Sequence, residues 1–257
     1  MGEHGTWFDY LNRLPWWHDI NRDAENALGR HSLLTKMFPS GWTVVHVLVA
    51  LLVTLIITIG AINFFRGTRK DRGIVPPRKM TFRHAFEYLA ETTYNMVESA
   101  LGEKHAKAFY PFVGALWFFI FFGNLFALIP GFVSSNDTLK TNVGLALLVF
   151  LMTHIVGVKE HGISYFKHFL GPVWWLSPLM LPIELISHIA RPVSLSLRLM
   201  GNMLADHKVV MSFFALVPLF VPLPFMLLGL LVCVIQALVF CSLTLVYFQM
   251  ALAHEEH

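Results

Sequence analysis

The chain has 257 residues, of which 56% are hydrophobic and 14% are charged, and its formal net charge is +3. A single soluble core of this size could not bury so much apolar surface, so lipid must cover the excess and a soluble globular protein is excluded. The positive charge is small and lies beside apolar runs, as juxtamembrane charges do, so we expect no nucleic-acid partner.

The N-terminal part of the chain predicts its orientation. Residues 1–41 contain no apolar run and do not read as a secretory signal, so we expect an extramembrane or interfacial segment. Residues 42–65 form the clearest membrane span, because about 20 apolar residues match a hydrocarbon core of about 30 Å. Seven basic residues and one acid follow between positions 66 and 83. The positive-inside rule therefore places this loop in the cytoplasm and the N-terminus outside.

The rest of the chain is a series of predicted helices. Residues 81–101 place apolar side chains at helical spacing among acidic ones, which predicts an amphipathic helix lying on the membrane. Apolar runs and their stop signals predict further spans over residues 109–129, 142–158, 176–217 and 222–252. The predicted fold class is an all-α integral membrane protein with about five membrane-embedded helices and one interfacial helix. Residues 42–257 then form one membrane domain, with the C-terminus in the cytoplasm.

The fourth span carries one polar face. On a helical wheel of about 100° per residue, its polar residues share an arc of about 120°. These residues are Glu184, Ser187, His188, Arg191, Ser194, Arg198, Asn202 and Asp206. Arg198 lies roughly 20 Å along the helix from Glu184, where an interface is hard to reach. Burying an arginine at mid-bilayer costs roughly 2.5–3.5 kcal/mol on insertion scales, so we interpret Arg198 as a functional residue that needs a carboxylate partner.

Two interpretations of Arg198 follow from its surroundings. A structural ion pair within the chain is the simpler one, but Glu184 and Asp206 lie on the same helix and too far along it. We therefore favour a carboxylate on another protein. Gln236 is the one strongly polar residue in the middle of the last span. Such a residue is typical of interhelical hydrogen bonding, and its amide could meet the guanidinium of Arg198 across a helix pair.

The segment over residues 191–203 reads RPVSLSLRLMGNM and resembles the signature of subunit a of F-type ATP synthase. The resemblance covers roughly residues 40–257, including Asn124 with LIPGF at 128–132, Glu184, Gln236 and Tyr247. It implies that Arg198 faces a ring of c subunits, whose mid-membrane carboxylates supply the missing partner. It also implies that the last two spans are long and tilted against this ring. The other implied partners are the b-subunit peripheral stalk, the soluble F1 sector and membrane lipid.

The same resemblance implies two offset half-channels for protons. The cytoplasmic one is lined by Glu184, Ser187, His188 and Ser194; the outer one is lined by Asn202, Asp206, His207 and Gln236, with Tyr247 and Gly229 in support. Protons then enter from outside, protonate a ring carboxylate, travel with the turning ring and leave inside. Relatives pair an acid or histidine near the end of the fourth span with a complementary residue where this chain has Gly229. We hypothesise that Asp206 fills the space beside Gly229 as the outer carboxylate; a water-filled gap around His207 is the alternative.

Three other functions are weighed against this interpretation. A secondary transporter also places charges on broken helices but usually shows paired halves. A membrane assembly subunit would hold Arg198 in a structural salt bridge, and a membrane enzyme would show clustered nucleophiles or metal ligands. His46, His154, His161 and His168 lie near predicted span ends, where interfacial hydrogen bonding is the usual role, and they show no metal-binding spacing.

The sequence also bears on catalysis and location. No glycine-rich phosphate loop is present, so we do not expect the isolated chain to make ATP, and we expect no cofactor. The chain would instead work beside soluble catalytic subunits. The absence of a transit peptide favours a bacterial plasma membrane over an organelle.

Overall fold

The computed structural model describes residues 44–70, 82–129, 132, 134–162, 177–216 and 222–252, together with residues 17, 19, 20, 22 and 23. The long helices in these ranges are α3 (Val44–Lys70), α4 (Phe82–Ala127), α5 (Leu139–His161), α7 (Ser177–Leu216) and α8 (Pro222–Leu252). No strand occurs in the described part of the chain, so the predicted all-α class is confirmed. The predicted N-terminal segment 1–41 lies almost wholly outside the described residues.

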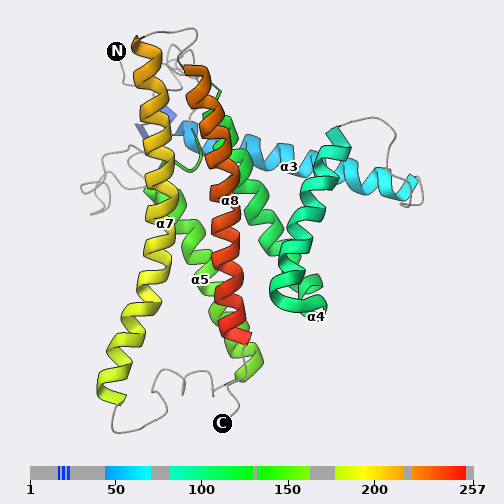
Figure 1. The fold of residues 1–257 in the computed structure, drawn as a ribbon, viewed down its shortest axis with the longest axis vertical. Coiled ribbons are helices and arrows are strands. Elements are labelled where there is room, and N and C mark those ends of the chain that lie inside the picture. The colour runs from blue at the N-terminus through cyan, green and yellow to red at the C-terminus, as the bar shows by residue number, and fades with distance from the viewer. Residues whose placement is uncertain are drawn as a thin grey trace.

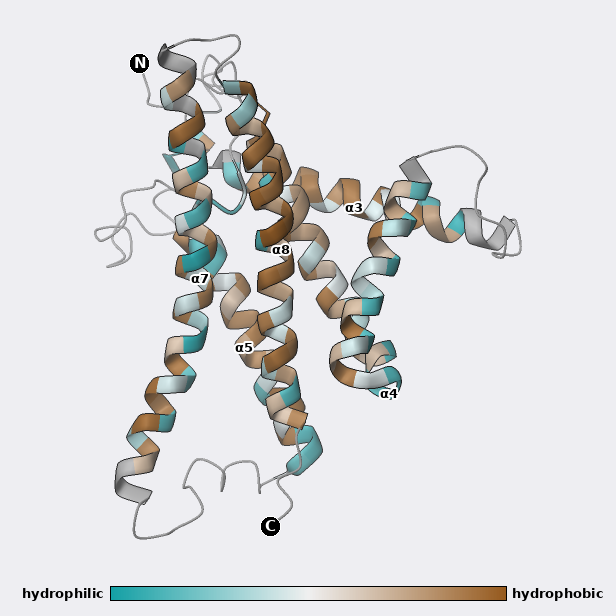
Figure 2. Ribbon diagram, viewed as in Figure 1, coloured by the Kyte–Doolittle hydropathy of each residue, from teal (hydrophilic) through white to brown (hydrophobic). Residues whose placement is uncertain are grey.

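The last two helices of the chain, α7 and α8, run side by side. Figure 1 shows α7 and α8 as antiparallel helices, with α5 packed against both. The largest interface joins α4 to α8, and α3 packs on α4. Figure 2 shows hydrophobic positions along most of α3 and α8, whereas hydrophilic positions recur along α7. Of these two adjacent helices, α7 therefore carries more of the polar residues than α8.

Among the residues that the structure describes, four helices are long and apolar enough to cross a membrane, over His46–Arg66, His84–Ala127, Leu139–His161 and Pro222–Leu252. Each exposes large apolar side chains, such as Leu55 on α3 and Leu227 on α8. A soluble monomer rarely exposes so many, whereas a lipid-facing surface requires them. The fourth predicted span, residues 176–217, corresponds to α7, which has 40 residues and many ionisable side chains. Its bounds agree with the prediction to within a residue at either end.

The predicted interfacial helix and the second span are joined in one element, α4. The break between them lies at Gly102, whose φ is 76° and ψ is 161°. Glycine adopts this conformation readily because it has no Cβ. The two arms of α4 fold back on each other, with the Phe86 and Phe118 rings stacked at 4.6 Å. The Tyr110 hydroxyl also donates a hydrogen bond to the Ala90 carbonyl oxygen at 3.3 Å. Figure 1 shows the resulting sharp reversal.

The core of the molecule is centred on α8, which packs against α4 on one side and against α5 and α7 on the other. Its largest fully buried side chains include Ile120, Leu199, Phe240 and Phe248. The Phe248 ring lies 5.1 Å from that of Phe109 on α4, so aromatic packing joins the two helices. This core holds α7 in place through one side only and leaves its other side uncovered by the described chain.

Candidate functional site

Arg198 lies near the middle of α7, and its side chain is exposed. On one flank of Arg198, which we call its open face, the exposed residues lie within an arc of about 100° and are small or apolar. They are Ala190, Ser194, Leu197, Gly201 and Ala205, whereas Asn202 is exposed on the other flank. Leu195 and Leu199 point the other way, into the core. Within the described part of the chain no ion pair includes Arg198. The arginine therefore stands on a face that the described helices leave open.

Gln236 is 4% exposed and lies on the face of α8 that meets α7. The Asn202 Nδ2 donates a hydrogen bond of 2.6 Å to its Oε1, one turn of α7 beyond Arg198. The structure thus differs from the suggested Gln236–Arg198 contact. Arg198 is turned to the open face, whereas the side chain of Asn202 reaches α8. The side-chain amides of Asn202 and Gln236 therefore link α7 to α8 next to Arg198.

The carboxylate of Asp206 lies directly against the backbone of Gly229. A Cβ built on Gly229 would stand 2.6 Å from Oδ2 of Asp206 and 2.7 Å from Cδ2 of Leu128. Any side chain at position 229 would collide with the carboxylate, so Asp206 occupies the space predicted for it. Its role as the outer proton-carrying group stays a prediction. The side chain of His207, the predicted alternative, lies outside those that the structure describes.

A buried polar cluster lies at the same end of the molecule, where α4 leads into α5. Asn136 Nδ2 donates to Asn124 Oδ1 at 3.0 Å, and Asn142 Nδ2 donates to the Asn136 carbonyl oxygen at 2.8 Å. All three asparagines are 2% exposed or less. Polar groups at membrane depth need partners inside the protein, and each of these amides has one, although Oδ1 of Asn142 accepts no hydrogen bond from the described residues. Only Asn124 was singled out from the sequence, although the run of polar residues between two apolar spans marks the whole cluster.

The remaining residues of the polar face lie closer to the start of α7. His188 is 9% exposed, and its Nδ1 lies 3.1 Å from the Glu184 carbonyl oxygen and 3.4 Å from the carboxylate Oε1 of the same residue. The guanidinium of Arg191 lies over the Tyr247 ring, 5.4 Å from its centroid. Such a contact is a favourable cation–π interaction. Ser187 and Glu184 are half-buried at the edge of this group, whereas Ser194 is exposed on the face of Arg198.

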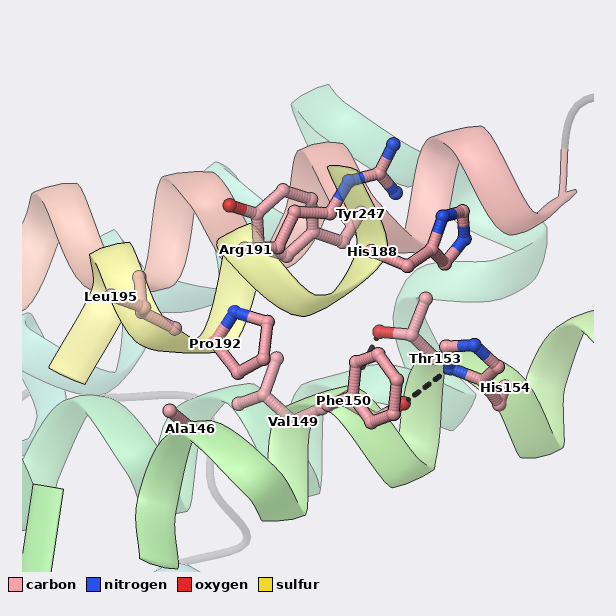
Figure 3. Close-up of a pocket in the computed structure, with 10 residues that line it drawn as sticks. All are labelled: Ala146, Val149, Phe150, Thr153, His154, His188, Arg191, Pro192, Leu195 and Tyr247. Atoms are coloured by element: carbon pink, nitrogen blue, oxygen red, sulfur yellow. Dashed lines mark hydrogen bonds between the residues drawn. The ribbon is translucent and has the colours of Figure 1, made fainter. Parts of the chain in front are cut away.

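These residues surround a small pocket between α5, α7 and α8, shown in Figure 3. Its volume is about 10 Å³, near the lower limit for one water molecule. Its lining includes Phe150, Thr153 and His154 from α5, His188 and Arg191 from α7, and Tyr247 from α8.

One pocket residue was missed by sequence reasoning. His154 was assigned an interfacial role, but its ring centroid lies 5.5 Å from that of His188, and the rings meet edge to face. The sequence does indicate that His154 lies on one face of a helix with Phe150 and Thr153, because these residues are three and four positions apart. The sequence does not show which helix that face meets.

Comparison with known proteins identifies relatives along most of the chain. Residues 44–249 match the family model described as ATP synthase A chain. The chain is 48% identical over 202 residues to ATP synthase subunit a 2 of Syntrophotalea carbinolica, which covers 79% of this chain and 82% of the relative. It is 53% identical over 155 residues to ATP synthase subunit a of Geobacter sulfurreducens, covering 60% and 67% respectively. It is 42% identical over 206 residues to ATP synthase subunit a of Bdellovibrio bacteriovorus, covering 78% and 90%.

Proposed function

Because this chain belongs to the family of ATP synthase subunit a, the multi-pass membrane component of the bacterial F-type enzyme, we propose that it is the proton-channel stator of that rotary enzyme. In this role it provides two offset half-channels and the arginine that exchanges protons with the carboxylates of a c-subunit ring. Proton flow is thereby coupled to ring rotation and ATP synthesis. The chain itself binds no nucleotide and works beside the soluble F1 sector and the b-subunit peripheral stalk.

The observation that carries this proposal is the open position of Arg198. Its face consists of small and apolar side chains, which let another helix approach closely in a membrane. A ring carboxylate about 4 Å from the guanidinium, at an effective dielectric near 20, gains roughly 4 kcal/mol in its ionised form, or about three pKa units. Since arginine does not lose its proton, a carboxylate that reaches it must release its own. The fixed positive charge also repels protons that would pass straight between the half-channels.

The polar groups on α7 lie on both sides of Arg198, as two half-channels require. Asp206 and the Asn202–Gln236 hydrogen bond lie toward one end, and Asp206 is about 12 Å along the helix from the arginine. Glu184 and the buried His188 lie toward the other end. With the N-terminus outside and the C-terminus in the cytoplasm, the first group opens outward and the second inward. Ser187 and Ser194 extend the inner group, and His207 and Gly229 belong to the outer one.

The test is ATP-driven acidification of inverted membrane vesicles that carry wild type or Arg198→Lys. Lysine keeps the charge, but it can release its proton and lacks the planar guanidinium. We expect pumping to be abolished while the soluble ATPase sector still co-purifies with the membrane sector. Arg66→Lys, at an exposed arginine on α3, is the matched control and should pump as wild type does. Pumping that survives Arg198→Lys would show a structural ion pair instead.

A further inference from the structure

The two imidazoles in the pocket come from different helices and are held in the same way. His154 Nδ1 lies 2.8 Å from the Phe150 carbonyl oxygen, and His188 Nδ1 lies 3.1 Å from the Glu184 carbonyl oxygen. A carbonyl oxygen only accepts hydrogen bonds, so Nδ1 is the donor in both neutral rings. This fixes the tautomer and leaves Nε2 as the nitrogen that takes up a further proton.

The groups around His154 and His188 favour a single added proton on the two rings over two. His188 is buried, which disfavours a charge on its ring, and Glu184 offsets part of this cost by placing a carboxylate oxygen 3.4 Å away. Arg191, also on α7, adds a positive charge that disfavours a second proton, and it is turned toward Tyr247 of α8. Two protonated imidazoles with centroids 5.5 Å apart would in addition repel each other. A single proton shared between the rings is thus the favoured charged state.

We propose that His154 is a further proton-transfer residue, which forms with His188 a two-histidine relay through the pocket between α5 and α7. His188 takes a proton on Nε2 and becomes an imidazolium. It then gives that proton to Nε2 of His154, directly or through one water molecule, and returns to its neutral form. One proton and one positive charge move in each transfer, and no other group changes its protonation.

The relay rests on the proposed function and adds a route to it. His188 faces the core side of α7, whereas Ser194 and Arg198 are exposed on the open face. The inner pathway therefore leads through the stator between α5 and α7, in addition to any path along the ring-facing surface. His154 is seven residues before the end of α5 at His161, or about 10 Å of helix, so the proton leaves at the cytoplasmic end of α5.

The first test compares His154→Gln with His161→Gln in the assembled enzyme. His161 lies on the same helix, and its Nε2 contacts the Ala251 carbonyl oxygen outside the pocket. Passive proton conduction is measured after removal of the soluble sector, over a range of pH. We expect His154→Gln to conduct roughly tenfold more slowly and to depend less on pH than wild type. The loss should stay below the 10²–10⁴ typical of a positioned acid–base group, because the pocket has about the volume that one water molecule needs to carry the proton instead. His161→Gln should keep the wild-type rate and profile. Wild-type conduction by His154→Gln would overturn the relay.

A second test separates proton transfer from packing. His154→Ala is assayed with added imidazole and with added thiazole, a ring of similar size that is scarcely basic. Restoration by imidazole alone supports the relay, whereas equal restoration by both rings, or by neither, overturns it. If His154→Gln does not assemble, His188→Gln takes its place. If both single variants assemble, the double variant should conduct no more slowly than the slower of the two.

Failure of the relay is distinguishable from failure of the proposed function. Arg198→Lys is assayed for ATP-driven pumping in the same vesicle system. If this variant does not pump and His154→Gln conducts as wild type, only the relay is wrong. If Arg198→Lys pumps normally, the channel function itself is wrong.

Discussion

Gly229→Ala tests whether the position of the Asp206 carboxylate matters for proton uptake. The added Cβ would lie 2.6 Å from Oδ2 of Asp206 and 2.7 Å from Cδ2 of Leu128, whereas ordinary contacts of a Cβ begin at about 3.4 Å. Both neighbours must move, and the carboxylate must withdraw from α8. Overpacking of this kind costs roughly 1–3 kcal/mol, which disfavours the present position of the carboxylate by about 5- to 150-fold.

The assay is proton conduction through membranes stripped of the soluble sector, together with ATP-driven acidification before stripping. We expect Gly229→Ala to lower both rates by at least about fivefold, the lower limit set by the packing cost, while the complex still assembles. Gly144→Ala is the matched control, because a Cβ on Gly144 of α5 meets nothing within 4 Å. That variant should conduct and pump at wild-type rates.

A double variant decides between loss of the carboxylate position and general damage. Asp206→Ser combined with Gly229→Ala relieves the collision but supplies no carboxylate, so assembly should be sound and conduction should stay low. Full conduction in Gly229→Ala alone would refute the reasoning, because the carboxylate would have been displaced without effect. Recovery of conduction in the double variant would show that packing alone matters at this site.

Three further predictions follow from described contacts. Asp206→Asn keeps the shape of the side chain and removes its charge, so proton-driven turnover should fall with assembly intact; unchanged turnover would remove Asp206 from the outer pathway. Gln236→Leu breaks the hydrogen bond with Asn202, and we expect a loss of stability of about 0.6–1.7 kcal/mol in thermal unfolding of the detergent-solubilised complex, the range for interhelical hydrogen bonds in membranes. Gly102→Ala places a side chain at φ 76° and ψ 161° with nothing within 4 Å, so its cost should come from the backbone alone. We expect a loss of roughly 1–3 kcal/mol in the same assay, and Gly144→Ala should show no such loss.

The helices were predictable from the sequence because the length of an apolar run is a local property. The two arms of α4 match the predicted ranges 81–101 and 109–129 within a few residues. What the pattern did not show is that the arms form one helix that reverses at Gly102. That reversal depends on one backbone conformation and on the stacking of Phe86 against Phe118, neither of which changes hydrophobic periodicity.

The site was predictable where it depends on one helix and less so where two helices meet. The helical wheel placed Arg198 and His188 in one polar arc, but the two flanks of that arc differ in surroundings: Arg198 is exposed and His188 is buried against α5. The Asp206–Gly229 contact was anticipated because a missing side chain leaves a definite space. The contact between His188 and His154 was not predicted, because neither segment alone shows that α5 packs against α7.

The packing of α8 on α4 has a mechanical consequence. A stator that meets a turning ring along α7 receives a sideways load, and a single pair of helices in fluid lipid would yield to it. Under the proposed function, the load would pass from α7 to α8 and through the Phe109 and Phe248 rings into the folded arms of α4, on which α3 also packs. The helices α3 and α4 lie at an angle to the pair formed by α7 and α8, as Figure 1 shows, and would brace it. Stiffness against torque would then come from the apolar part of the chain, which would keep the polar face of α7 aligned with a moving ring.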